Sequence, residues 1–460
     1  MNNLVALARS LRNQDYGDMR IDSRQVRQGD IFLALPGTGA LHGAAFIETA
    51  LEAGATLVLI DRSDEARIET QDHRDRIMLV DNLSLHLGQF AAAFYDDPSH
   101  KLPVVGITGT DGKSSTAYFV AQFLSDKAPA YFIGTVGHGD WDALEYQENT
   151  TPSVVDVHRL IAQAVEREAP AVVMEVSSHA IALNRIDCVQ FAAKVLTNLG
   201  RDHLDFHRTI EAYHATKVNW YQDGRMPKFS GVSGHEGYVP VVDVVAQVNG
   251  IEWHTVIGGH QTEIRAKLIG DFHAENISLA VNVVHSFTAE SVEALIEKVL
   301  NLRSVVGRMQ LFQRDDLPTV VVDFAHTADA LHRAISALKS HRFGAINVVF
   351  GCGGDRDPGK RPLMGKVATE EADFVFITND NPRTEVPEAI VQDILKGIVG
   401  SNFVIQLDRA QAIAEAIAKS PLDSVVLVAG KGHETDQIVG TTRYHFSDVE
   451  EVGKIFGVQP

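Results

Sequence analysis

Short runs of apolar residues, each followed by a stretch with the spacing of an amphipathic helix, recur along most of this chain. The first runs are 30–35 and 55–60, and a helical pattern near 45–53 lies between them. Strands that alternate with helices are typical of α/β domains, in which helices join the strands of one sheet. The pattern predicts a small α/β domain at the N-terminus, and the polar stretch Asp96–Ser99 after it reads equally well as a linker or an ordinary loop.

A second α/β unit begins with the apolar run 104–108, and its later strands are 171–176 and 193–198. These runs are almost continuously apolar, as in parallel strands that are buried on both faces. The pattern restarts after Gly307 with the strands 319–323, 345–350, 374–378 and 424–429. We therefore predict an α/β protein of three domains: a small N-terminal α/β domain (1–98), a central parallel-sheet domain (99–306) and a doubly wound, Rossmann-like C-terminal domain (307–460).

The turn after the first central strand has the composition of a phosphate-binding loop. It runs from Gly106 to Ser115, and a helical pattern starts at about Ser114. Glycines let backbone N–H groups turn toward an anion, Lys113 adds a positive charge, and the hydroxyl of Ser114 can hold Mg²⁺. The first glycine lies one residue earlier than in the usual Walker pattern, so the loop is a variant; a tight connection without a ligand is the less favoured alternative. The central domain is therefore predicted to be a P-loop ATPase-type domain.

The composition of the chain mainly excludes certain partners and classes of protein. A net charge of −19 in 460 residues argues against a nucleic-acid-binding surface, which needs clustered Lys and Arg. The N-terminus lacks a basic segment followed by a long apolar stretch, and no apolar run approaches the roughly 18 residues of a membrane span. Two cysteines, Cys188 and Cys352, fit a reducing compartment better than a disulfide scaffold. We expect a cytoplasmic protein with small-molecule substrates and no nucleic-acid or membrane partner.

Polar side chains follow the strands of the central domain. Glu175 closes an apolar strand at the edge where open α/β sheets bind ligands, so it is a candidate Mg²⁺ ligand, although an acid satisfied within the fold is equally plausible. His203 and His207 are four residues apart, which fits either a metal site on one helical face or a solvated loop. Lys217 lies in a helical pattern and, taken alone, reads as a surface lysine.

Four strand ends in the third domain also carry polar groups, at 323–326, 353–357, 380–385 and 430–434. In the third of these segments Pro382 stiffens a loop that presents Arg383, whose planar guanidinium suits a carboxylate. Each segment alone reads equally well as a simple turn. Their convergence on one edge of a sheet favours a binding site over a purely structural interpretation.

Together these segments resemble the Mur ligases, ATP-dependent amide-forming enzymes of bacterial cell-wall (peptidoglycan) synthesis, in particular the MurE type. The resemblance covers nearly the whole chain and is carried by Asp22–Arg24, Gly106–Ser115, Asn149–Pro152, Glu175–His179, Thr197–Asp205, Gly307–Met309, Asp323–His326, Asp380–Arg383 and Gly430–Glu434. It implies that ATP phosphorylates the carboxylate of UDP-MurNAc-L-Ala-D-Glu, and that the amine of meso-diaminopimelate attacks the acyl phosphate. The three domains would bind the UDP-sugar, ATP with Mg²⁺, and the amino acid in that order.

The resemblance also implies roles for individual residues. The ATP contacts would be Gly109, Thr110, Asp111, Gly112, Lys113, Ser114, Ser115, Asn276 and Arg308. The Mg²⁺ ligands would be Ser114, Glu175, His203 and Lys217, the last as a carbamate. The catalytic set would be Lys113, Glu175, His203, Lys217, Arg308, Asp323 and His326. Acceptor contacts would be Ser23, Thr150, Thr151, Ser177 and Arg185, and amino-acid contacts Arg356, Asp380, Asn381, Pro382, Arg383, Gly430 and Glu434.

Two positions depart from the family pattern on the acceptor side. His42 stands where an acid is usual, and Leu183 replaces a glutamine. They keep open an alternative in which a ligase of the same fold acts on a different carboxylate in specialised metabolism. A scaffold protein that keeps the nucleotide fold without turnover is a third possibility. It is less favoured, because such a protein is expected to have lost at least one of the catalytic residues, all of which are present here.

Overall fold

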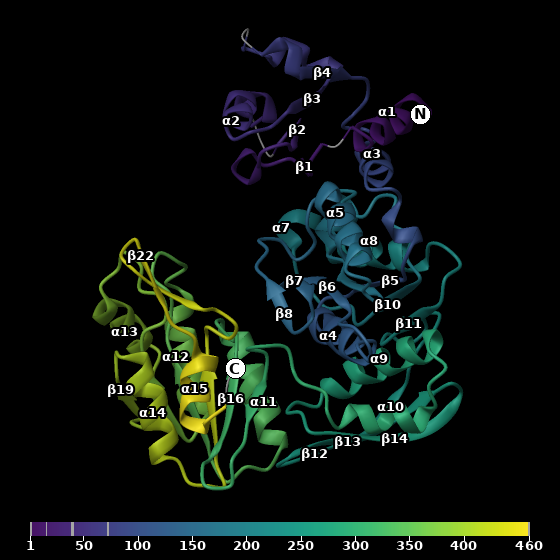
Figure 1. Cartoon of the computed structure of the whole chain (residues 1–460). Coiled ribbons are helices and arrows are strands. Elements are labelled where there is room, and N and C mark those ends of the chain that lie inside the picture. The colour runs from purple at the N-terminus through teal and green to yellow at the C-terminus, as the bar shows by residue number, and fades with distance from the viewer. Residues whose placement is uncertain (1, 15, 38–40, 71–72, 459–460) are drawn as a thin grey trace. The chain divides into compact units, whose positions relative to one another are not determined.

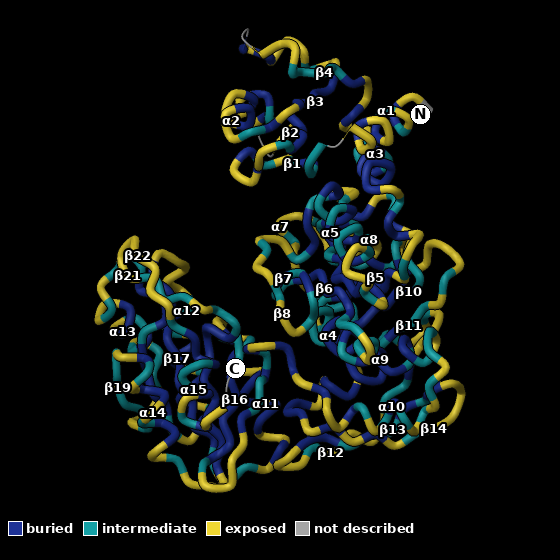
Figure 2. Tube along the Cα trace, viewed as in Figure 1, coloured by how far each residue is buried: buried dark blue, intermediate teal, exposed yellow. Residues whose placement is uncertain are grey.

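The structure is a computed structural model that describes residues 2–14, 16–37, 41–70 and 73–458. The chain divides into two compact units, Met1–Tyr238 and Val239–Pro460. Figure 1 shows the elements of both, and Figure 2 shows that the strands of the large sheets form the buried interior of each unit. No helix in the described residues is long and apolar enough to cross a membrane.

The N-terminal part of the first unit is a parallel sheet in the order β1-β2-β3-β4. Its strands are β1 (Met19–Arg20), β2 (Ile31–Ala34), β3 (Leu57–Asp61) and β4 (Ile77–Val80). Alternate residues of β2 face opposite sides: Ile31 and Leu33 pack with α1 (Asn2–Arg12) and α3 (Leu87–Phe94), whereas Phe32 and Ala34 pack with α2 (Ile47–Glu52). The small α/β domain expected from the apolar pattern is thus present.

The rest of the first unit is built on a seven-stranded sheet in the order β11-β10-β5-β9-β6-β7-β8. The strands are β5 (Val104–Thr108), β6 (Tyr131–Gly134), β7 (Gly137–Asp140), β8 (Ala143–Glu145), β9 (Val172–Glu175), β10 (Ala193–Leu196) and β11 (Lys228–Ser230). The helices are α4 (Lys113–Phe123), α5 (Val154–Glu166), α6 (Ser178–Ala182), α7 (Leu204–His207) and α8 (Ile210–Gln222). Because β10, β5 and β9 are parallel neighbours, their carboxyl ends lie at one edge of the sheet.

The second unit begins with an antiparallel sheet of β12 (Val241–Gln247), β13 (Gly250–Ile257) and β14 (His260–Ala266). The helices α9 (His273–Phe287) and α10 (Val292–Val299) pack on it, and the indole N–H of buried Trp253 donates to Ser278 Oγ on α9 at 2.8 Å. The apolar pattern did not predict this sheet. Several valines of β12 are exposed, so the strand lacks the regular in-and-out alternation of a half-buried strand.

The remainder of the second unit is a six-stranded sheet in the order β15-β16-β20-β17-β18-β19. Its strands are β15 (Gln310–Phe312), β16 (Thr319–Asp323), β17 (Ile346–Phe350), β18 (Phe374–Ile377), β19 (Phe403–Ile405) and β20 (Val425–Ala429), and only β15 is antiparallel. One face is covered by α11 (Ala328–Ser340), α12 (Lys360–Glu371) and α13 (Pro387–Leu395), and the other by α14 (Arg409–Lys419) and α15 (Asp448–Phe456). This is the predicted doubly wound domain, with the hairpin of β21 (Asp436–Val439) and β22 (Thr442–His445) added to it.

Candidate functional site

The phosphate-binding loop joins β5 to α4 in a conformation that requires glycine. Gly109 and Gly112 have φ of 146° and 79°, in the region that L-residues rarely adopt. A Cβ on Gly109 would lie 1.8 Å from Thr197 Oγ1, so no larger residue fits there. The helix begins at Lys113, one residue before the predicted start, which places its N-terminal N–H groups at the loop.

The end of β10 holds this loop in shape. Asn198 Oδ1 accepts from the N–H of Asp111 at 2.9 Å, and Asn198 Nδ2 donates to Asp111 O at 3.1 Å. Thr197 Oγ1 also donates to Asp111 O, at 2.6 Å. The sequence analysis gave neither Thr197 nor Asn198 a role in the site, although their position directly after an apolar strand was a usable signal. The loop is therefore preformed by contacts that span almost 90 residues of sequence, since the Asp111–Asn198 pair is separated by 87 positions.

Two lysines meet at the base of the loop. Lys113 Nζ donates to Gly109 O at 3.1 Å and to Thr110 O at 2.8 Å, and Lys217 Nζ donates to Gly109 O at 2.7 Å. Lys217 lies on α8 as predicted, but the side chain is 1% exposed, so the interpretation as a surface lysine is wrong. Burial, together with the nearby ammonium of Lys113, lowers the pKa of Lys217 to about 7.

Glu175 is fully buried at the end of β9, next to β5. Its Oε1 accepts from the N–H of Thr135 at 2.8 Å, and its Oε2 accepts from Thr135 Oγ1 at 3.2 Å. These bonds fix the direction of the carboxylate. Thr135 follows β6 and was not among the predicted site residues; the only signal for it was a hydroxyl directly after an apolar strand.

His203 and His207 do come together, but not on one helical face. The helix α7 is a single turn, and His203 lies just before it with φ of 51°. Both rings contact His179, at centroid distances of 4.7 and 5.8 Å. Within the described residues, no group of three or more His, Cys, Asp or Glu side chains is arranged to hold a metal ion.

The predicted acceptor residues of the central sheet gather around Glu175. Thr151 Oγ1 donates to Glu175 O at 2.7 Å and accepts from the N–H of Ser177 at 3.1 Å, while Arg185 Nη1 donates to Thr151 O at 3.0 Å. Thr150 Oγ1 lies 3.0 Å from Thr135 Oγ1. A row of hydroxyl groups therefore leads away from the buried carboxylate.

A groove of about 820 Å³ extends this polar surface toward the N-terminal sheet. Its lining includes Asp22, Arg24 and Gln25, which surround buried Ser23, and also Asn149, Pro152 and Ser153 of the central domain. Both guanidinium groups and carboxylates line it. The groove is large enough for an extended polar ligand and brings the predicted Ser23 segment to the same surface as the segment after β8.

His42, which stands where an acid is usual in the family, stabilises the start of a short helix. The imidazole caps the 3-10 helix Gly43–Phe46, because its Nδ1 accepts from the N–H of Ala44 at 3.0 Å. Its Nε2 lies 3.3 Å from Asp64 Oδ2. The histidine thus performs the capping that an acid side chain performs at a helix start. Leu183, in contrast, ends α6 with half of its surface exposed.

The predicted nucleotide residues of the second unit lie near the start of its six-stranded sheet. Asp323 accepts from the N–H groups of Met309 and Ala325, both at 2.9 Å, and burial raises the pKa of its carboxyl group. The guanidinium of Arg308 lies 4.6 Å from the ring centroid of Phe324. His326 follows on the same turn, and Asn276 is buried on α9. Asp323 therefore shapes the segments that carry Arg308 and His326.

The predicted amino-acid residues cluster after β18 and β20. Asn381 Nδ2 donates to Glu434 Oε2 at 2.9 Å, and Arg383 Nη1 donates to Gly354 O at 2.9 Å. Arg383 has φ of 50°, held by backbone hydrogen bonds to the β21–β22 hairpin. Asp380 and Gly430 lie against each other, since a Cβ on Gly430 would be 3.0 Å from Asp380 Oδ2. Pro382 is buried in the same loop, whereas Arg356 is exposed.

Comparison with known proteins agrees with this arrangement. Family models match in the expected order: "Mur ligase family, catalytic domain" at 16–95, "Mur ligase middle domain" at 107–226 and "Mur ligase, glutamate ligase domain" at 307–432. The UDP-N-acetylmuramoyl-L-alanyl-D-glutamate–2,6-diaminopimelate ligase of Alkalilimnicola ehrlichii is 38% identical over 96% of this chain and 95% of its own. The chain belongs to the Mur ligase family.

Other relatives and solved structures extend the similarity to the whole fold. The ligase of the same name from Vibrio vulnificus is 36% identical over 96% of this chain and 94% of its own. A solved structure of such a ligase has a TM-score of 0.65 and 28% identity, covering 96% of this chain and 95% of that one. The MurF ligase of Thermotoga maritima, in complex with ADP, shares the fold at a TM-score of 0.61 and 18% identity, over 90% and 93% of the two chains. As a Mur ligase, this chain is an ATP-dependent, ADP-forming ligase.

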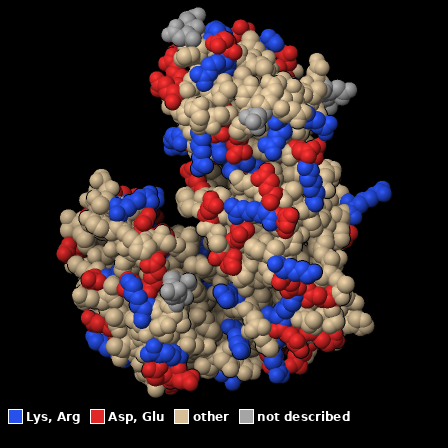
Figure 3. All heavy atoms as spheres, in the orientation of Figure 1, with Lys and Arg blue, Asp and Glu red and all other residues tan. Residues whose placement is uncertain are grey.

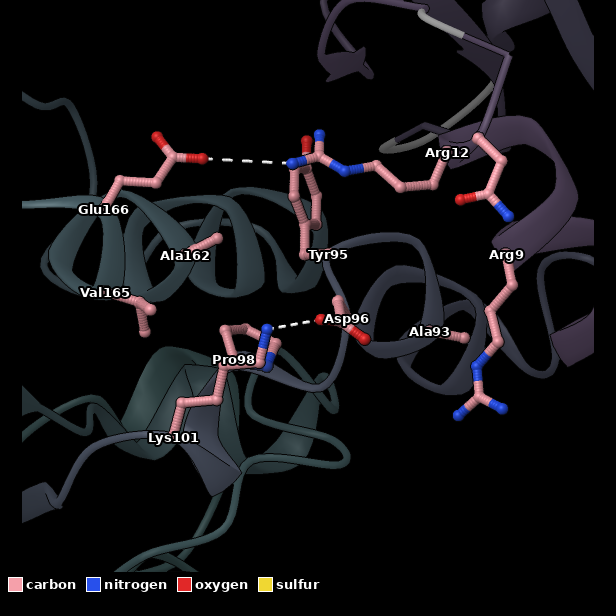
Figure 4. Close-up of a pocket in the computed structure, with 11 residues that line it drawn as sticks. Arg9, Arg12, Ala93, Tyr95, Asp96, Pro98, Lys101, Ala162, Val165 and Glu166 are labelled. Atoms are coloured by element: carbon pink, nitrogen blue, oxygen red, sulfur yellow. Dashed lines mark hydrogen bonds and ion pairs between the residues drawn. The ribbon is translucent and has the colours of Figure 1, made fainter.

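A second cavity, of about 430 Å³, lies among α1, the end of α3 and α5 of this Mur ligase, away from the strand ends (Figure 4). Its cations are already partnered: Arg12 lies 3.9 Å from Glu166, and Lys101 pairs with Asp96. Figure 3 shows the same mixture over the face it draws, with basic and acidic side chains side by side. Surface pairs of this kind are weak and leave little net attraction for a charged ligand.

Proposed function

We propose that this Mur ligase adds meso-diaminopimelate to UDP-MurNAc-L-Ala-D-Glu, the reaction for which its relatives of 36–38% identity are named. The observation that carries the choice of amino acid is the cluster of Asn381, Arg383 and Glu434. The distal end of meso-diaminopimelate has both a carboxylate and an ammonium, which match a guanidinium and a carboxylate held close together. Lysine has only the ammonium.

We divide the chain for this function into 1–98 for the UDP-sugar, 99–306 for ATP and 307–460 for the amino acid. The groove beside Ser23 fits an extended acceptor, and the row of Thr150, Thr151, Ser177 and Arg185 leads from it to Glu175. In this proposal the acceptor's carboxylate lies near the phosphate-binding loop. The proposed location is the cytoplasm.

The residues of the central site fit ATP with Mg²⁺. The loop with Gly109 and Gly112 leads into the N-terminus of α4, whose N–H groups suit phosphate oxygens, and oxygen donors such as Ser114 and Glu175 are the kind that Mg²⁺ prefers. Bound Mg²⁺ supplies positive charge where the phosphoryl group moves between two anions.

Side chains and backbone N–H groups of the chain would bind the substrates and stabilise the developing charge. Lys113 and the N–H groups of the loop bind the β- and γ-phosphates and stabilise the charge that develops between the carboxylate and the leaving ADP. The cluster at Arg383 binds the donor's distal end and leaves its other amine free to react. Exclusion of water protects the acyl phosphate until the amide forms.

Lys217 is proposed to act as a carbamate. Its amine is buried beside Lys113, and this environment favours the neutral form that attacks CO₂; the nitrogen bonds to carbon and loses one proton, leaving a carboxylate-like ligand for Mg²⁺. We expect Lys217→Ala to lower ligation about a hundredfold or more, with partial rescue by short carboxylic acids. Lys127→Ala, an exposed lysine beyond α4, is the matched control. A Lys217→Ala enzyme with the wild-type rate would exclude this role.

The function is tested by ADP release from the purified protein with a panel of carboxylate acceptors and amino acids. We expect turnover only when UDP-MurNAc-L-Ala-D-Glu and meso-diaminopimelate are both present. If ADP is released only with a different carboxylate acceptor, the chain is instead a ligase of specialised metabolism. No ADP release with any pair would favour a protein that only binds nucleotide.

A further inference from the structure

Lys431 is a fully enclosed cation near the candidate amino-acid cluster. It follows β20 after Gly430, and its side chain has no exposed surface. Its ammonium donates to three acceptors: Glu434 Oε2 at 2.9 Å, Asn381 Oδ1 at 3.2 Å and Asp436 O at 2.6 Å. An ammonium has three N–H donors, so the protein uses all of them and leaves none for a substrate.

The side chains that accept hydrogen bonds from Lys431 are held in place by Lys431 and by further hydrogen bonds. Glu434 Oε2 accepts from both Lys431 and Asn381. Asn381 Oδ1 accepts from Lys431 and, at 2.9 Å, from the N–H of Ile438 on β21. The loops after β18 and β20 and the hairpin are therefore tied together at one buried ammonium.

This arrangement leaves one oxygen of Glu434 for a ligand. Within the described part of the chain, Oε1 has no hydrogen-bond partner, and about a third of the side chain is exposed. Burial by itself would raise the pKa of Glu434, but the ammonium of Lys431 and the hydrogen bonds from Lys431 and Asn381 hold it below its usual value. The carboxylate is thus ionised, with its direction fixed by Oε2.

We propose that Lys431 is a positioning residue for the choice of amino acid: it holds Glu434 so that Oε1 receives the distal ammonium while Arg383 receives the distal carboxylate. The proposal rests on the proposed function. Lys431 does not touch the substrate and acts only through Glu434 and Asn381. A lysine that merely stabilised the fold would, when removed, change the binding of all three substrates alike.

The test compares wild type with Lys431→Met, which keeps the length of the side chain and removes the charge. We expect KM for meso-diaminopimelate to rise about tenfold or more, because loss of a charge-assisted hydrogen bond is worth roughly one power of ten or more in affinity. KM for ATP and for the acceptor should change less than about twofold. Lys366→Met, an exposed lysine of α12 that is 56% exposed, is the matched control and should behave as wild type. An equal change in all three KM values, or none, would overturn the proposal.

Comparing Glu434→Gln with the double variant that also carries Lys431→Met keeps the test decisive even when Lys431→Met alone does not fold. In the double variant both charges of the pair are removed, so no buried charge is left without its partner. If Lys431 acts through Glu434, adding Lys431→Met to Glu434→Gln changes KM for meso-diaminopimelate less than about twofold. A further tenfold rise would show that Lys431 acts by another route. Wild-type enzyme that ligates no diamino acid would instead overturn the proposed function itself.

Discussion

Lys113→Ala is expected to reduce ligation by about two to three orders of magnitude. The lysine supplies the positive charge that faces the β- and γ-phosphates, and removal of one such group from a preorganised site costs about a hundredfold to a thousandfold in kcat. The backbone cradle survives, because Thr197 and Asn198 hold the backbone of Asp111. Steady-state ADP release with saturating substrates measures the effect.

Two controls separate loss of chemistry from loss of fold in this experiment. The circular dichroism spectrum and the melting temperature of Lys113→Ala should stay close to those of wild type, since the hydrogen bonds from Lys113 to Gly109 O and Thr110 O contribute about 1 kcal/mol each. Lys127→Ala should keep the wild-type rate. If Lys113→Ala ligates as fast as wild type, the loop is not the catalytic ATP site.

Arg383→Ala is expected to reduce kcat/KM for meso-diaminopimelate about a hundredfold or more. One guanidinium nitrogen, Nη1, donates to Gly354 O, whereas Nε and Nη2 have no hydrogen-bond partner within the described residues and can pair a carboxylate. Loss of such a buried charged pair costs a few kcal/mol, and each 1.4 kcal/mol is about tenfold in rate. The affinity for ATP should hardly change.

Kinetics with meso-diaminopimelate and with lysine on both enzymes decide this prediction. Wild type should strongly prefer meso-diaminopimelate, because lysine leaves the guanidinium without a partner and brings a cation toward it. Arg443→Ala, an exposed arginine on β22 that is 71% exposed, is the control and should keep the preference. A wild-type preference for lysine, or an unaltered kcat/KM in Arg383→Ala, would show that this loop does not select the donor.

Some of the site was visible in the sequence because its signals are local. A strand buried on both faces needs an uninterrupted apolar run, and a turn with positive φ needs glycine, so the strand before the loop and the positions of Gly109 and Gly112 could be located from neighbouring residues. Glu175 was found as a candidate for the same reason, since the end of an apolar strand marks the edge of a parallel sheet.

Other features had no local signal. Lys217 has the surroundings of a surface residue in its own helix and becomes buried only because α8 packs beside the phosphate-binding loop. Thr135 matters through Glu175, which is 40 positions away in sequence. The shared contact of His203 and His207 with His179 depends on a left-handed residue before a one-turn helix, which their spacing of four did not predict.

The sequence by itself determined the order of the α/β elements, the phosphate-binding loop and the family, because these depend on the spacing of apolar residues and on short motifs. Only the tertiary structure decided which polar groups are already committed to the protein and which are left for a ligand. Lys431 shows the difference: it lies between Gly430 and Glu434, which were predicted to contact the amino acid, yet its own three N–H donors are all taken by Glu434, Asn381 and Asp436. These hydrogen bonds join the ends of strands that are distant in sequence. They form only when the folded sheet brings those strand ends to one edge.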